Sequence, residues 1–303
     1  MSNINYVLSY INPDTDGIAC SIAMAKLLSS ENEEWIPGFF GGIGEETLFL
    51  LDQLGIPVPD VDILLNKAEK IVLVDTHHKA QLPADFPYGK VVAVIDHHPN
   101  GDDELFPKAD IKNQKVGAAA SLVAERYLER RIDDKPVLRL LAYAILSNTL
   151  NFYAPSSSEF DKDIFKQICD IVPIEETLID KMFEHRSLVL KKDIYTALGT
   201  DFKIFETKKG RVGISQIEAY NLEKLVEVSQ CVAALQRIAD EKELEFCFFN
   251  GVDIKLKRSI VVAGNQKSQE LLGMLFQLKE CKEFQIFDRI LLRKTDFIPR
   301  LNL

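Results

Sequence analysis

Short apolar runs alternate with helical patterns through the first half of the chain. The runs Lys70–Val74 (KIVLV) and Lys90–Ile95 (KVVAVI) are rich in β-branched residues and apolar on both faces, as in buried parallel strands. The other elements predicted here are strands over Tyr6–Ser9 and Glu34–Phe40 and helices over Gly17–Leu28, Gly117–Arg131 and Pro136–Leu150. Strands that alternate with helices in this way predict βαβ units and a parallel sheet.

The pattern changes after Glu184, and the charged stretch Arg186–Asp193 is predicted to connect two domains. The elements predicted beyond it are strands over Phe202–Phe205, Arg211–Ile217, Glu245–Phe249, Ser259–Ala263 and Asp288–Leu292 and helices over Leu222–Glu241 and Ser268–Phe276. This mixture predicts a smaller α+β domain. The expected organisation is an α/β protein with a first domain at 1–186, a linker at 187–194 and a second domain at 195–303.

Length, composition and charge narrow the class of protein. The chain has 303 residues, of which 47% are hydrophobic and 27% charged, enough to bury two cores. Its net charge of −10 argues against a general nucleic-acid-binding surface, which would have to be basic. A small anionic substrate stays compatible with this charge, because a local basic or metal-lined cleft can override the global balance.

The apolar runs and the cysteines predict the cellular compartment of the protein and whether it associates with a membrane. The apolar runs are too short to span a membrane, and residues 1–10 lack the basic and apolar regions of a secretory signal. The five cysteines have no CxxC spacing: Cys20, Cys169, Cys231, Cys247 and Cys281. We therefore expect reduced thiols in a cytoplasmic protein, without a disulfide framework, a zinc site or a membrane partner.

Aspartates and histidines gather directly behind three predicted strands. They are Asp14 and Asp16 in NPDTDG, Asp75 with His77 and His78 in VLVDTHH, and Asp96 with His97 and His98 in VAVIDHH. Ligands of open parallel sheets bind outside the carboxyl ends of strands, so these clusters are expected at one rim. Carboxylates with imidazoles suit Mn²⁺, Co²⁺ or Mg²⁺, and a carboxylate such as Asp75 could bridge two ions. Taken alone, an aspartate such as Asp16 could instead cap a helix.

Four motifs occur in a fixed order along the chain: NPDTDG, VDTHH, DHHP and ILSNTLNF. In this order they resemble the motifs of the DHH phosphoesterase superfamily, most closely the manganese-dependent (family II) inorganic pyrophosphatases and next the related exopolyphosphatases. VGAAASLVAERYL, TDFKIF, VVAGN and LLRKTDFIPRL extend the resemblance over nearly the whole chain. It implies a DHH domain with a parallel sheet, a DHH-associated substrate-binding domain and an active site in the cleft between them.

The resemblance also implies metal ligands. Asp14 resembles a ligand of a first metal ion, Asp16 and His97 resemble ligands of a second, and Asp75 resembles the bridging ligand. Asp96 would orient His97 from behind. The implied cofactor is a pair of divalent ions, Mn²⁺ or Co²⁺, with Mg²⁺ as a further candidate.

Substrate contacts are implied at four further positions. His98 resembles a phosphate contact or proton donor, and Lys203, Arg293 and Lys294 resemble residues that grip the phosphate. Basic side chains suit this task, because Arg offers a fork to phosphate oxygens and Lys a point charge. Without the resemblance, Arg293 and Lys294 would be interpreted as a solvated strand end.

Two positions depart from the pyrophosphatase pattern. Ile11 stands where that family opens its first motif with histidine, and Asn148 stands where it has aspartate in the fourth. Ile11 cannot bind a metal and Asn148 offers only a neutral amide oxygen, so weaker metal binding and a shift toward Mg²⁺ are expected. His77, two residues after Asp75 in an extended chain, could supply the missing imidazole. The alternative is a surface histidine in a loop.

The predicted function is hydrolysis of pyrophosphate to two orthophosphates by a water activated by two metal ions. One alternative is an exopolyphosphatase that acts on short-chain polyphosphate. Another is a weakly active or non-catalytic protein that binds phosphate compounds, which the departures at Ile11 and Asn148 favour. A homodimer is expected by analogy with the family.

Overall fold

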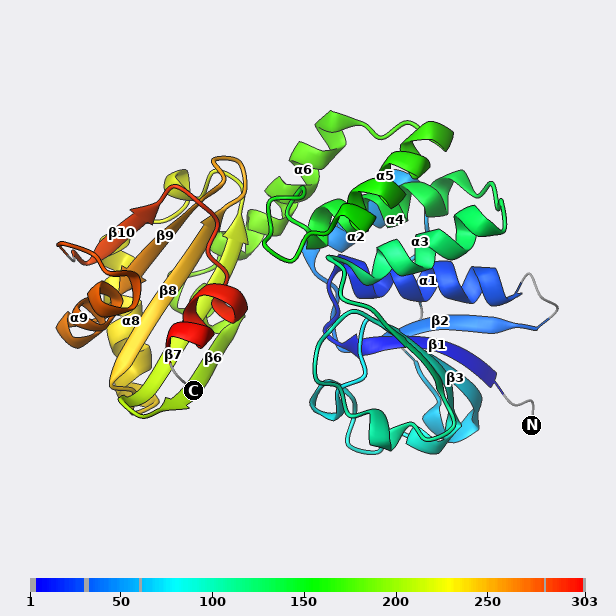
Figure 1. Ribbon diagram of the computed structural model, residues 1–303, viewed down its shortest axis with the longest axis horizontal. Coiled ribbons are helices and arrows are strands. Elements are labelled where there is room, and N and C mark those ends of the chain that lie inside the picture. Colours follow the sequence, from blue (N-terminus) through cyan, green and yellow to red (C-terminus); the bar gives the residue numbers. More distant parts are fainter. Residues whose placement is uncertain (1–3, 30–32, 60–61, 281, 302–303) are drawn as a thin grey trace. The chain divides into compact units, whose positions relative to one another are not determined.

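The computed structural model describes residues 4–29, 33–59, 62–280 and 282–301 (Figure 1). The chain divides into two compact units, one that ends at Met182 and one that begins at Phe183. Within the described residues, each unit contains a five-stranded sheet. The first sheet is parallel and the second is mixed, which confirms the predicted fold class.

The first sheet has the strand order β2-β1-β3-β4-β5. Its strands are β1 (Ile4–Ile11), β2 (Trp35–Phe40), β3 (Ala68–Val74), β4 (Val91–Asp96) and β5 (Asp110–Asn113). The helices of this part of the chain are α1 (Thr15–Ser29), α2 (Glu45–Leu54), α3 (Ala119–Glu129), α4 (Lys135–Asn148), α5 (Glu159–Ile171) and α6 (Glu176–Arg186). Figure 1 shows α1, α3, α4 and α5 on one face of the sheet.

Both faces of this sheet are buried, which explains the unbroken apolar runs in its strands. Val72 and Val74 pack against the helices in one core. Ile71 and Leu73, which point to the other face, pack against Phe86 and other residues of the loops in a second core. Helix packing on one face and loop packing on the other therefore hold the carboxyl ends of β3 and β4 in place.

The second sheet has the strand order β10-β9-β8-β7-β6. Its strands are β6 (Phe202–Thr207), β7 (Gly210–Ala219), β8 (Phe246–Asp253), β9 (Arg258–Ala263) and β10 (Phe284–Phe287). Only β7 and β8 pair in parallel among the described strands of this sheet. The helices are α7 (Ile194–Gly199), α8 (Val228–Glu241) and α9 (Gln266–Phe276). Phe249 and Val262 face the core under α8, and Phe248 and Val261 face the core under α9.

Three expectations for this unit differ from the structure. The segment predicted as a strand over Asp288–Leu292 is irregular, because Leu291 bonds to the side chains of Asn250 and Ser259 instead of to a neighbouring strand. The helix predicted over Leu222–Glu241 is a 3₁₀ turn followed by α8; both bury apolar residues in one core, so the apolar spacing continues across the break. The expected linker at 187–194 forms a 3₁₀ helix and the start of α7.

The lengths of the helices and the state of the cysteines bear on membrane association and on disulfide bonding. Among the helices in the described ranges, none combines the length and apolarity needed to cross a membrane. Cys20, Cys169, Cys231 and Cys247 are free thiols, and Cys281 lies outside the described residues.

Candidate metal centre

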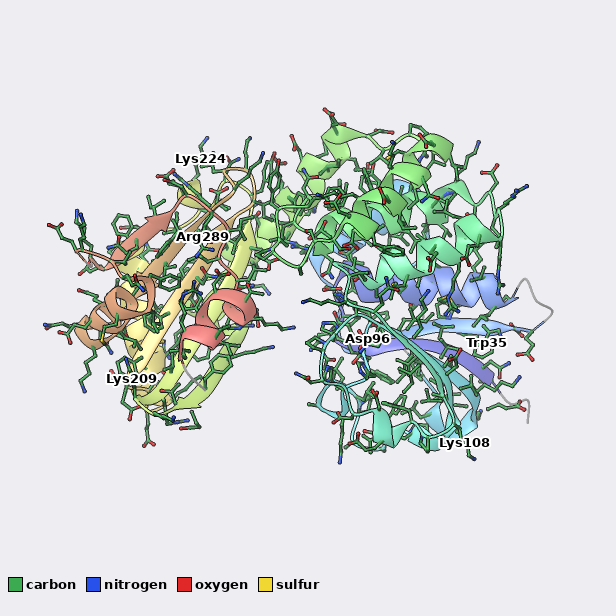
Figure 2. All side chains as sticks on the ribbon, in the orientation of Figure 1. Trp35, Asp96, Lys108, Lys209, Lys224 and Arg289 are labelled. Carbon is green, nitrogen blue, oxygen red and sulfur yellow. The ribbon has the colours of Figure 1, made fainter. Side chains whose placement is uncertain are left out.

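Three parallel strands bring aspartates to one edge of the first sheet. Asp96 is the last residue of β4 and is labelled in Figure 2, and Asp75 directly follows β3. Asp14 lies in the turn before α1, and Asp16 lies in the first turn of that helix. Asp14 and Asp16 are close enough to Asp75 for their charges to raise its pKa. The clusters from three separate motifs therefore meet, as the carboxyl ends of parallel strands predict.

Asp75 combines a buried side chain with an unusual backbone. Its φ of 59° lies in the left-handed region, which residues other than glycine rarely adopt. Its amide donates to the carbonyl oxygen of Ile95 at 2.8 Å, and its side chain is buried. Strained backbones of this kind cluster at functional sites. The left-handed turn also ends the extended path of β3.

The imidazole of His97 faces the carboxylate of Asp75. Its Nδ1 donates to the carbonyl oxygen of Val116 at 2.9 Å, which leaves the lone pair of the neutral ring, the form that binds a metal, on Nε2. Nε2 lies 3.2 Å from Oδ1 of Asp75, yet the two atoms do not meet in hydrogen-bonding geometry, and neither has another hydrogen-bond partner among the described residues. Buried polar atoms of this kind need a partner. A divalent ion fits both atoms, because imidazole and carboxylate are ligands of the Mn²⁺ class.

Asp16 has protein partners on both carboxylate oxygens. Its Oδ1 accepts from the amide of Ala120 at 2.7 Å, and its Oδ2 accepts from the amide of Ala119 at 2.8 Å. These amides open α3, where helix N–H groups lack intrahelical partners. Nδ2 of Asn148 donates to the same Oδ2 at 3.1 Å. Asp16 therefore caps a helix, as the alternative interpretation proposed, although the helix is α3 and not α1.

Asp96 holds the second histidine of the DHH motif. Its Oδ1 accepts from Nδ1 of His98 at 2.8 Å and from the backbone amide of His97 at 2.7 Å. Burial alone would raise the pKa of Asp96, but hydrogen bonds from His77 and His98 outweigh burial and lower it. The ring that Asp96 orients is thus that of His98, whereas the ring of His97 is oriented by a backbone carbonyl.

His77 is fully buried and does not fit the expected role of a replacement ligand. Its Nδ1 bonds to Oδ2 of Asp96, and its Nε2 lies 3.2 Å from Oδ1 of Asp103 and 3.3 Å from Nδ2 of Asn113. Both ring nitrogens are therefore already engaged by protein groups. The expectation assumed an extended chain between residues 75 and 77, but the left-handed backbone of Asp75 turns the chain.

The residue that β1 directs to this edge is Tyr10. Its hydroxyl accepts the amide hydrogen of Asp14 at 3.1 Å. Burial of the hydroxyl and the charges of Asp14 and Asp75 raise its pKa well above the ordinary value. Ile11, which was expected at the position of a histidine ligand, is 40% exposed, and neighbouring residues of a strand face opposite sides. The hydroxyl of Tyr10, and not the side chain of Ile11, therefore lies beside Asp14.

Burial and charge crowding shift the pKa values of three groups at this edge. Burial and the charge of Asp14 raise the pKa of Asp16 to about 7, against the opposing effect of His97. Burial and the charge of Asp16 raise the pKa of Asp75 well above its ordinary value. Burial alone would lower the pKa of His97, but contact with Asp75 and the charge of Asp16 raise it to about 10. The carboxylates thus favour a nearby positive charge.

These shifts predict how the stability of the metal-free protein changes with pH. Asp16, with a folded pKa of about 7 against 3.8, stabilises the fold fully below pH 3.8, and this contribution is lost as the pH rises through 7. His97 changes the stability of the fold in the same direction, because its contribution is lost as the pH rises from 6.5 through about 10. We expect the Tm in EDTA to fall between about pH 5 and about pH 9, and saturating Mn²⁺ to reduce this fall. A Tm that rises over this range in EDTA would contradict the assignment.

The predicted phosphate-binding residues lie together in the second unit. Partial burial and the charges of Arg293 and Lys294 lower the pKa of Lys203, although Asp201 opposes them. Lys203 and Lys294 are exposed, whereas Arg293 is buried. Nη2 of Arg293 donates to both carboxylate oxygens of Asp201 at 2.7 and 2.8 Å, and Nη1 donates to the carbonyl oxygens of Asp201 and Ile214. Most of its donors are therefore used within the protein.

The side chain of Arg293 should therefore contribute to the free energy of unfolding, whereas that of Lys294 should contribute little. We expect Arg293→Lys to destabilise the protein by about 2 kcal/mol, because one lysine nitrogen cannot serve the Asp201 carboxylate and both carbonyl oxygens at once. The ion pair itself contributes little, since the side chain of Asp201 is 46% exposed. The control Lys294→Ala should change stability by less than about 0.5 kcal/mol. Denaturant unfolding of the full chain compares the two, and equal effects would refute the structural role of Arg293.

The sequence interpretation missed the groups that support the centre. Tyr10 is half-buried beside Asp14, and Asp103 and Asn113 hold the far side of His77. Asp102 and Asp103 in NGDDEL follow the DHH motif closely in sequence, and this acidic pair was the one available signal. The carbonyl of Val116 could not be found from residue type, because a backbone oxygen has no sequence signature.

Family models match both units of the chain. The DHH family, N-terminal domain, matches residues 5–146, and the DHHA2 domain matches residues 180–302. A parallel sheet with a DHH motif at its carboxyl edge, followed by a DHHA2 unit, defines a protein of the DHH class.

Similar proteins narrow this class to one family. A manganese-dependent inorganic pyrophosphatase of Methanocaldococcus jannaschii is 30% identical over 99% of this chain and 98% of its own. A Clostridium acetobutylicum protein with the name "probable manganese-dependent inorganic pyrophosphatase" is 27% identical over 100% of this chain and 98% of its own. The crystal structure of a Methanococcus jannaschii protein assigned as a family II inorganic pyrophosphatase superposes with a TM-score of 0.77, at 27% identity and 98% coverage of both chains. The chain belongs to the family of manganese-dependent (family II) inorganic pyrophosphatases.

Proposed function

We propose that this protein hydrolyses inorganic pyrophosphate to two orthophosphates in a reaction that depends on a divalent metal. The observation that carries the proposal is the buried pair of Asp75 Oδ1 and His97 Nε2, 3.2 Å apart and without hydrogen-bond partners among the described residues. The names of the relatives support pyrophosphate as substrate and manganese as metal. A cytoplasmic location and a homodimer stay predictions.

Asp75 and His97 would hold the metal, and Asp14 and Asp16 would add negative charge beside it. A divalent ion bound there would lower the pKa of a bound water and polarise a phosphoryl oxygen. The imidazole of His97 favours Mn²⁺ or Co²⁺, while the surrounding carboxylates also accept Mg²⁺. Asp16 and Asp75 are buried, which strengthens their electrostatic effect, whereas Asp14 is exposed.

Other residues of the chain would act on the substrate. His98, whose Nδ1 is held by Asp96 at 2.8 Å, is oriented to donate a proton to the departing phosphate. Lys203 and Lys294 would neutralise charge on the phosphate oxygens. Arg293 would support this group by fixing Asp201 and the backbone around it, and its remaining capacity for a phosphate is small.

Phosphate release with Mn²⁺, Co²⁺ and Mg²⁺ in turn, on pyrophosphate and on tripolyphosphate, tests the proposal. We expect the fastest release from pyrophosphate with Mn²⁺ or Co²⁺. Faster release from tripolyphosphate would replace the proposal by an exopolyphosphatase. No release from either substrate, with pyrophosphate binding retained in calorimetry, would replace it by a non-catalytic phosphate-binding protein.

A further inference from the structure

We infer that the centre holds one resident divalent ion, bound by Asp75 and His97, and that Asn148 takes the place of a second ion by bonding directly to Asp16. This inference rests on the proposed function for its link to catalysis, while its evidence is the ligand set alone. Four carboxylates meet at this edge: Asp14, Asp16, Asp75 and Asp96. The number of ions depends on how many of their oxygens are already committed to hydrogen bonds.

The side-chain amide of Asn148 is oriented by two acceptors. Its Nδ2 lies 2.9 Å from the carbonyl oxygen of Gly117 and 3.1 Å from Oδ2 of Asp16. Both neighbours can only accept, so turning the amide over would set its oxygen against two other oxygens. Asn148 therefore presents N–H groups, and not its carbonyl oxygen, to Asp16. A hydrogen bond joins the two residues where two carboxylates would need a cation between them.

Asp16 has little capacity left for a metal. Besides Asn148, it accepts the amides of Ala119 and Ala120, and Sγ of Cys20 lies 3.6 Å from Oδ1. Three nitrogen donors and a thiol thus surround a side chain that is fully buried. A cation would have to displace donors that open α3, which would leave buried helix N–H groups without partners.

The other two carboxylates at the edge are also committed, in whole or in part. Asp96 accepts from His98 and from the backbone of His97 through Oδ1, and from His77 through Oδ2. Asp14 caps the start of α1, because its Oδ1 accepts the amides of Asp16 at 2.9 Å and Gly17 at 3.2 Å. Its neighbour from β1 is the hydroxyl of Tyr10, a far weaker ligand than imidazole while it keeps its proton.

Asp75 and His97 stand apart from these residues. Among the described residues, they alone combine membership of the metal-ligand cluster with a buried ligand atom that has no hydrogen-bond partner. One divalent ion between them would bind Oδ1 of Asp75 and Nε2 of His97 at once. The ligand set thus favours a single resident ion.

Manganese titration of the full-length protein tests the inference without relying on activity. Calorimetry should give about one Mn²⁺ per wild-type chain, and the electron paramagnetic resonance spectrum should lack the coupling of an ion pair about 3.5–4 Å apart. Asn148→Asp restores a carboxylate beside Asp16 and should raise the stoichiometry to about two. In EDTA this variant should lose roughly 5 °C in Tm, because a half-buried carboxylate then faces the buried carboxylate of Asp16, and Mn²⁺ should reverse the loss.

Asn151→Asp is the matched control, since it makes the same change on the loop after α4 at a residue that the described contacts do not join to Asp16. It should bind one ion and keep the wild-type Tm response to Mn²⁺. Two ions in the wild type, or one ion in Asn148→Asp with a wild-type Tm response, would overturn the inference. One ion without phosphate release would overturn only the proposed function, whereas two ions with release would overturn only the inference.

Discussion

Replacing Asp75 with asparagine is expected to lower kcat for pyrophosphate by about 10³-fold or more. Asp75 is the buried carboxylate that faces His97 at 3.2 Å, and an amide oxygen carries no net charge to hold a divalent ion. The substitution keeps the size and shape of the side chain. The loss should therefore come from the metal centre, and Mn²⁺ calorimetry should show weaker binding in the same variant.

The same substitution should stabilise the metal-free protein. Burial and the charge of Asp16 raise the pKa of Asp75, which means that the folded state resists a charged carboxylate at this position. Asparagine removes that charge, so the Tm of Asp75→Asn in EDTA should exceed that of the wild type, whereas in saturating Mn²⁺ the order should reverse. If Asp75 had only a structural role, Mn²⁺ would not reverse the order of the two Tm values.

Asp110→Asn is the control for Asp75→Asn. Asp110 begins β5 of the same sheet and is exposed, so the same change of charge there should leave both kcat and the Tm near wild type. If Asp75→Asn keeps wild-type activity with Mn²⁺, the proposed metal centre is wrong.

Replacing His77 with alanine is expected to lower kcat by about 100-fold and to destabilise the protein by roughly 3 kcal/mol. His77 is fully buried between Asp96 and Asp103. Its loss removes one hydrogen bond from a charged, buried carboxylate and leaves a cavity behind the DHH motif. Asp96 would then hold His98 less firmly, and a small misplacement of a catalytic group is costly.

His78→Ala separates this role from a general effect on the loop. His78 is half-buried, and its ring lies edge-on to His98 with the centroids 6.2 Å apart. Its removal should cost less than about 1 kcal/mol and leave kcat within a few-fold. Denaturant unfolding and steady-state phosphate release compare the two variants. An unchanged kcat in a folded His77→Ala protein would remove the positioning role.

The elements that carry the centre could be predicted from local patterns. The runs before Asp75 and Asp96 are apolar at consecutive positions because both faces of the sheet are covered, and that pattern is visible in any short window of sequence. The position of both aspartates at strand ends follows from the same windows. The strand proposed over Asp288–Leu292 failed because its apolar residues are buried beside the sheet, and apolar spacing alone does not reveal which groups satisfy the backbone.

Sequence alone thus determined the fold class, the DHH edge and the acidic and imidazole residues gathered there, because these depend on periodicity and on motifs within a few residues. Only the tertiary structure decided what each side chain contacts. Tyr10 rather than Ile11 faces the edge, and Asn148 donates to Asp16 across 132 positions of the chain. His77 turns to Asp96 because Asp75, two residues before it, adopts a left-handed backbone. Hydrogen-bond partners distant in sequence have no local pattern, so only the folded chain reveals them.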